Sequence, residues 1–140
     1  MAFLEWLREY EIGHEQIDAQ HRHLVDMVNN LHVATIAGEG VQVLAPVLKE
    51  LVDYVREHFR AEEQLAASFA PEECALQRAA HAKIVKRLKE VIAISRSAPQ
   101  RASVELTSLL KAWVIKHVLV VDKRLAQYLP SGSRSGKQAA

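Results

Sequence analysis

The sequence predicts an all-α protein, an antiparallel up-down-up-down four-helix bundle with an N-terminal arm. Glycine and proline are scarce among the 140 residues, at five and four, and they cluster between long segments. Within those segments apolar residues recur every three or four positions, which is the period of an amphipathic helix. No segment shows the alternation of apolar and polar residues that is typical of strands. Long helices joined by short connections favour the up-down-up-down arrangement.

The first two helices are predicted from their capping and turn residues. Asp18 is expected to cap the first helix, which ends near the glycines of GEG at 38–40. The second helix runs from about 41 to 67, with Pro46 near its start, where a missing N–H costs little. Residues 1–17 then form an arm outside the bundle. Its expected apolar anchors are Phe3, Leu4, Trp6 and Leu7.

The other two helices follow proline-containing breaks. Pro71 opens the third helix, predicted over about 71–95, with two glutamates in its first turn, where carboxylates suit the helix dipole. The break SRSAPQRAS leads to a fourth helix, predicted over about 102–128. The chain is therefore expected to form one domain over 1–130, followed by a disordered tail at 131–140.

The composition argues against several classes of function. The formal net charge is +1, so neither a nucleic-acid partner nor a membrane-surface partner is expected. Cys74 is the single cysteine, which excludes an intrachain disulfide and suits a reducing compartment. No apolar run approaches the roughly 18 residues of a membrane span, and the acidic N-terminal segment is unlike a signal peptide. We expect a cytoplasmic protein.

Polar residues on the apolar helix faces carry the functional information. His58 and Glu62 lie one turn apart on the second helix, and Gln77 and His81 lie one turn apart on the third. Side chains four residues apart share one helix face. Buried polar groups persist when they pair with each other or bind metal. The candidate metal ligands, drawn from all four helices, are His21, His58, Glu62, Gln77, His81, His117 and Asp122.

Four imidazoles and two carboxylates make a mixed nitrogen and oxygen donor set. Such a set suits iron, manganese or zinc better than calcium. Two carboxylates on different helices can bridge, which favours two metals over one. One spacing fits poorly, because His117 and Asp122 are five residues apart, about 140° around a regular helix. A π-type turn would bring the two closer, so we predict one between 116 and 123.

These motifs together resemble the hemerythrin family, in particular its single-domain bacteriohemerythrins. The matching segments are IDAQHRHL at 17–24, YVREHFRAEEQL at 54–65, the proline-led third helix with His81, and LLKAWVIKHVLVVD at 109–122. The resemblance spans roughly residues 6–129. It implies a pair of non-haem iron ions with an oxo or hydroxo bridge, and dioxygen or another small diatomic molecule as ligand.

The resemblance also implies a role for each residue. The implied ligands are His21 and His58 for one iron, His81 and His117 for the other, and Glu62 and Asp122 as bridges. The implied apolar wall of an oxygen pocket consists of Leu24, Phe59, Trp113, Val114 and Val121. No residue is assigned a catalytic role.

Gln77 departs from the family pattern, which has a third histidine for the second iron at this position. Three outcomes are open from the sequence. Gln77 binds metal through its amide oxygen, or it leaves a water or an open position there. In the third outcome, Glu73 or Cys74, one turn earlier on the same helix, takes the place of the missing ligand.

Three functions are open at this stage. The leading one is a dioxygen-binding di-iron protein for carriage, storage or sensing. An open position at Gln77 would suit a di-iron redox enzyme of peroxidase, ferroxidase or nitric-oxide-handling type. The third is a metal-poor binding module whose bundle serves an unknown protein partner.

Overall fold

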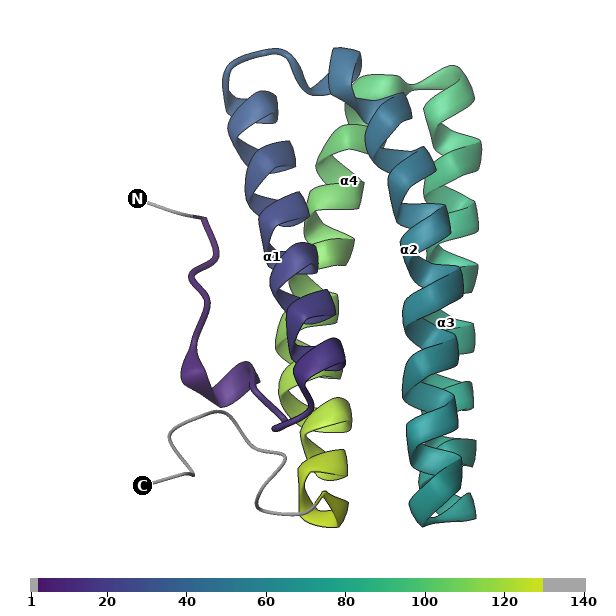
Figure 1. Cartoon of the computed structure of the whole chain (residues 1–140). Helices are drawn as coiled ribbons and strands as arrows, with labels where there is room; N and C mark the ends of the chain where they lie inside the picture. The colour runs from purple at the N-terminus through teal and green to yellow at the C-terminus, as the bar shows by residue number, and fades with distance from the viewer. Residues whose placement is uncertain (1–2, 130–140) are drawn as a thin grey trace.

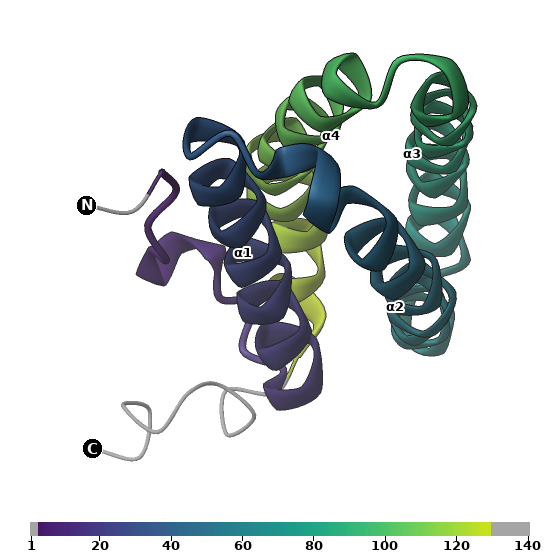
Figure 2. The same ribbon diagram turned by 90° about the horizontal axis from the view of Figure 1, so that it is seen from above.

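The computed structural model describes residues 3–129, which form an antiparallel up-down-up-down bundle of four long helices (Figures 1 and 2). Its helices are α1 (Glu15–Ile36), α2 (Gly40–Phe69), α3 (Pro71–Ser97) and α4 (Pro99–Ala112). The α4 helix continues directly as a π-helix, η2 (Trp113–Val121), and a 3-10 helix, η3 (Asp122–Tyr128). The described residues contain no strand. The predicted all-α fold is confirmed.

The connections at the ends of the bundle are very short. Single residues, Ala70 and Ala98, separate α2 from α3 and α3 from α4. The turn between α1 and α2 contains Gly38 at φ +80°, a left-handed conformation that favours glycine. Short connections force neighbouring helices to run antiparallel, and α1 also packs against α4 to close the bundle.

The start of α1 differs from the prediction. His14 caps the helix, since its Nδ1 accepts the backbone N–H of Ile17 at 3.2 Å. Asp18 lies inside the helix, where its carboxylate accepts the N–H groups of Ile12 and Gly13 at 2.8 and 3.1 Å. The predicted cap at Asp18 is therefore wrong, because this carboxylate instead ties the preceding arm to the first turn of the helix.

The N-terminal arm lies along the outside of α1 and includes a short 3-10 helix, η1 (Arg8–Tyr10) (Figure 1). Leu4 is buried and exchanges two hydrogen bonds with the Asn29 side chain, both of 2.8 Å. Phe3 and Trp6 pack against the core as expected. Leu7 is 41% exposed and takes no part in the core, so its predicted role as an anchor is wrong. The predicted tail at 131–140 lies outside the described residues.

Two apolar clusters divide the interior along its length. The larger runs from the α1–α2 end of the bundle to Phe59 and Trp113. The smaller contains Ile12, Ile17, Ala66, Cys74, Leu125 and Leu129. The predicted ligand residues lie on the helices between these clusters, so apolar side chains shield them from both ends. None of the helices within residues 3–129 has an apolar stretch of the length that a membrane span requires.

Candidate metal centre

The predicted ligands form a buried polar layer between the two apolar clusters. Each of the seven is at most 5% exposed. They comprise His21 from α1, His58 and Glu62 from α2, Gln77 and His81 from α3, His117 from η2, and Asp122 from η3. Since buried polar groups are costly without partners, their mutual contacts decide what the layer can do.

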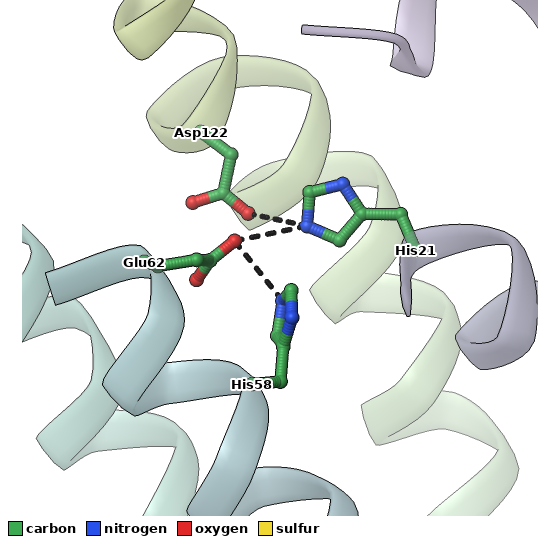
Figure 3. Close-up of side chains that lie close together, drawn as sticks. All are labelled: His21, His58, Glu62 and Asp122. Carbon is green, nitrogen blue, oxygen red and sulfur yellow. Dashed lines mark hydrogen bonds and ion pairs between the residues drawn. The ribbon is translucent and has the colours of Figure 1, made fainter. Parts of the chain in front are cut away.

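Glu62 occupies the centre of this layer. Its Oε2 lies 2.9 Å from the Nε2 of His21 and 3.0 Å from the Nε2 of His58, contacts that Figure 3 shows. Its Oε1 lies 2.8 Å from the Nε2 of His81 and 3.5 Å from the Nε2 of His117. One carboxylate therefore faces imidazoles from all four sides of the bundle, and each of its oxygens faces a different pair.

Asp122 also faces two imidazoles, one from each of the two pairs that face Glu62. Its Oδ2 lies 3.0 Å from His21 Nε2, and its Oδ1 lies 3.0 Å from His117 Nε2. The layer thus contains two quartets of potential ligands, His21–His58–Glu62–Asp122 and Glu62–His81–His117–Asp122. Within each quartet the ligand atoms lie within 4.8 Å of one another. Both quartets share the two carboxylates, as a two-metal site with bridging carboxylates requires.

The π-helix explains how His117 and Asp122 reach the same centre. The backbone N–H of Asp122 donates to the carbonyl of His117, five residues earlier. This widened turn brings the two side chains to one side of the helix. The predicted π-type turn is confirmed, and at nine residues the π segment is longer than the single turn expected.

The outer hydrogen bonds of His58 and His81 direct the Nε2 atom of each ring toward Glu62. The Nδ1–H of His58 donates to the side-chain carbonyl of Gln20 at 2.6 Å, and that of His81 donates to Glu63 at 2.8 Å. In a neutral ring the other nitrogen, Nε2, then presents a lone pair toward Glu62. His58 Nε2 is buried with no hydrogen-bond partner among the described residues. Lone pairs that converge in this way fit a bound metal ion.

Two further buried atoms support the same interpretation. His117 Nε2 and Asp122 Oδ2 also lack a well-formed hydrogen bond within residues 3–129. Buried polar atoms without a partner are rare in folded proteins. The donor set of imidazole nitrogens and carboxylate oxygens matches the preference of iron. The residues present therefore fit bound iron.

Protons can take the place of a cation in this layer. Burial acts to lower the pKa of His21, but its close contacts with the carboxylates of Asp122 and Glu62 outweigh burial and raise the pKa to about 9. The same balance raises the pKa of His117 to about 10. Burial acts to raise the pKa of Glu62, yet the charge of His58 and hydrogen bonds hold it well below its usual range. Metal must therefore compete with protons for these ligands.

Gln77 is turned toward the shared aspartate. Its Nε2 donates to Asp122 Oδ1 at 2.8 Å, while its Oε1 is buried with no hydrogen-bond partner in the described chain. Glu73 points elsewhere and receives two hydrogen bonds from Arg124 at 2.7 and 3.0 Å. Cys74 belongs to the smaller apolar cluster. Neither of these neighbours takes the place of the absent third histidine.

Four of the five apolar residues predicted to wall a ligand pocket are buried in the larger cluster, namely Leu24, Phe59, Trp113 and Val114. The ring of Phe59 stacks on His81 with a centroid distance of 3.7 Å. Val121 is only partly buried and lines a surface groove together with His117. Leu24, Phe59 and Val114 therefore lie in the core, whereas Val121 lies at the edge of the groove.

Sequence reasoning missed Gln20. It lies next to His21 in the sequence but orients His58, 38 residues away. Its backbone carbonyl also accepts the hydroxyl of Tyr54 at 2.6 Å. Nothing in the local pattern indicates such a role, because the pairing depends on how α1 packs against α2.

Comparisons with known proteins agree with this geometry. The family model described as Hemerythrin HHE cation binding domain matches residues 12–129. The bacteriohemerythrin of Stenotrophomonas maltophilia is 34% identical over 126 residues, covering 90% of this chain and 81% of that protein. The bacteriohemerythrin of Pseudomonas aeruginosa is 32% identical over 118 residues, 84% and 76% of the two chains. A myohemerythrin of Theromyzon tessulatum is 25% identical over 84% of this chain and 87% of its own length.

Proposed function

Because this chain belongs to the hemerythrin family, we propose that it holds two non-haem iron ions and binds dioxygen, or another small diatomic molecule, beside them. The two buried quartets that share Glu62 and Asp122 carry this proposal. One ion would lie between His21 and His58, and the other between His81 and His117. Carriage, storage or sensing of the gas is the function that this arrangement supports best.

Bound ferrous iron would supply the electrons with which dioxygen can be held reversibly or reduced. The protein residues would control which of these happens. Phe59, stacked on His81, and buried Trp113 would keep water from the pocket. Gln20 and Glu63 would fix the ring orientation of His58 and His81. A dry pocket around rigid ligands slows the proton delivery that irreversible reduction of dioxygen needs.

Gln77 favours a second candidate function, a di-iron redox enzyme. Its amide N–H group donates to Asp122, and its oxygen has no hydrogen-bond partner among residues 3–129. We propose that it positions Asp122 and leaves the second iron with two histidines. A less saturated iron can admit a substrate such as a peroxide or nitric oxide beside the diatomic ligand.

We also propose a cytoplasmic location for the protein, which its single cysteine suits.

Iron analysis combined with absorption spectroscopy tests the proposal. The protein would be reconstituted with ferrous iron under anaerobic conditions, exposed to air and purged again. We expect two irons per chain and a spectral change that reverses on removal of oxygen over repeated cycles. An irreversible change with consumption of added hydrogen peroxide would support the redox enzyme. Failure to retain iron would contradict both, and would favour a metal-poor binding module.

A further inference from the structure

A surface groove runs between α3 and the α4–η2 segment, on the side where His117 approaches the surface. It has a volume of about 640 Å³ and is open to solvent along one side. Its lining is mostly apolar and includes Leu76, Ala80, Ile84, Leu109, Ala112 and Val121. Leu76 is 49% exposed. Contiguous exposed apolar surface of this kind marks interaction sites.

The charged residues that line this groove are all basic. They are Lys83 on α3, Lys116 on η2 and Arg124 on η3. Arg124 is paired with Glu73, but Lys83 and Lys116 form no ion pair with any residue between 3 and 129. The groove therefore has two unpaired lysines in its lining and no acidic residue.

The shape of the groove favours a helix over a small molecule. Small-molecule sites enclose most of their ligand, whereas this groove is open. Its α3 wall, from Leu76 to Ile84, extends about 12 Å, a little over two helical turns. An amphipathic helix that lays apolar residues into a groove and acidic residues along its rim would satisfy both the apolar lining and the unpaired lysines.

We propose that this groove is a docking site for an acidic amphipathic helix of a partner protein. This goes beyond gas binding at the metal centre and does not require metal. The buried rings of Trp113 and His117 line the same groove. A docked helix would therefore cover the side of the candidate centre that is nearest to solvent, which places the partner where it would sense or control access to the ligand pocket.

A designed peptide can test this proposal with the full-length protein. The probe is an 18-residue helix with leucines at i, i+3, i+4 and i+7 spacing and glutamates on both flanks. Trp6 is replaced by phenylalanine, so that Trp113, one of two tryptophans, reports binding by fluorescence. We expect saturable binding that weakens about tenfold or more in Lys83→Glu/Lys116→Glu. Leu76→Gln should also weaken binding, through the lost apolar contact.

Matched controls separate this site from general attraction between charges. Lys49→Glu/Arg96→Glu changes the net charge equally, at exposed positions near the far end of the bundle, and should bind the acidic peptide nearly as well as the parent. The same peptide with lysines in place of glutamates should not bind. Equal binding of both peptides, or equal weakening by both double variants, would overturn the proposal. Binding is compared with and without iron, so failure to hold iron leaves the test intact.

Discussion

The two halves of the candidate metal centre share their carboxylates but differ in their surroundings. The inner half, His21 and His58, is completely buried. The outer half, His81 and His117, is 3% and 5% exposed, and His117 lines the surface groove. If Glu62 and Asp122 bridge two ions, both halves depend on the same two carboxylates, while the two halves differ in burial and in their outer contacts. We therefore propose that the inner half binds iron more tightly.

Gln77 increases this difference. Asp122 Oδ1, the oxygen that faces His117 at 3.0 Å, also accepts the Gln77 amide at 2.8 Å. Asp122 Oδ2, which faces His21, has no hydrogen-bond partner among the described residues. A metal in the outer half would share its Asp122 oxygen with the Gln77 amide donor, whereas a metal in the inner half would not. A bridge formed by Asp122 would therefore be asymmetric.

Replacing the shared glutamate should remove iron from both halves of the candidate centre. Glu62→Gln removes a negative charge that faces four imidazoles. We expect loss of both irons and a destabilisation of about 3–5 kcal/mol, because a buried charge pair loses one partner. Iron analysis and urea unfolding of the metal-free protein measure these effects. Glu57→Gln, an exposed position on the same helix, is the control, and full iron occupancy in Glu62→Gln would refute the bridging role.

Removing one imidazole from the inner or from the outer half should show which half binds iron more tightly. His81→Ala should retain one iron per chain, because the inner quartet remains complete. His58→Ala should retain less than one, because only the more weakly binding outer quartet remains. The iron content of each variant after gel filtration measures this difference. Identical retention by both variants would contradict the proposed order of affinity.

Two substitutions at Gln77 test whether the glutamine weakens the outer half. Gln77→His should raise the affinity for the second iron, by about 10–100-fold, the range seen when metal-orienting partners are changed. Gln77→Leu removes the amide from Asp122 without adding a ligand. If Leu alone gives most of the gain, competition for Asp122 Oδ1 limits the outer half. If only Gln77→His raises the affinity, the missing ligand limits iron binding in the outer half.

The stability of the metal-free protein and its affinity for iron should change in opposite directions with pH. Folding raises the pKa of His21 from 6.5 to about 9 and that of His117 to about 10. Their contribution to metal-free stability is therefore complete below pH 6.5 and is lost as the pH rises through about 9 to 10. Iron affinity should rise over the same range, since fewer protons compete. Urea unfolding and ferrous titration at several pH values check both trends.

The smallest effect on stability and iron content is expected for a substitution of Glu73, which lies outside the candidate ligand set. Its pairing with Arg124 holds the pKa of this carboxyl below its usual value, so any stability it contributes is lost as the pH falls through that lowered pKa. Glu73→Gln should leave iron content unchanged and lower stability less than Glu62→Gln, because Arg124 is half-exposed. Loss of iron from Glu73→Gln would instead identify it as a ligand.

Sequence periodicity was sufficient to predict the helices and to place the polar residues on their inner faces. The π-helix was predictable because His117 and Asp122 are five residues apart, a spacing that a regular helix cannot bring to one centre. Asp18 was misassigned because a carboxylate near a helix start can bind either its own helix or the preceding arm. Local sequence does not distinguish these two partners.

Long-range pairs were the part that sequence reasoning could not supply. The bond from Gln77 to Asp122 spans 45 residues, and that from His58 to Gln20 spans 38. Such bonds depend on how far one helix is rotated against the next, which apolar spacing determines only approximately. The same holds for the groove, since its lining comes from both α3 and the α4–η2 segment.

Anaerobic calorimetric titration of the metal-free protein with ferrous iron tests the asymmetry of the two halves most directly. We predict two binding steps of one ion each. The weaker step should disappear in His81→Ala and become stronger in Gln77→His. A single ion at saturation would contradict the account, as would two steps that neither substitution changes.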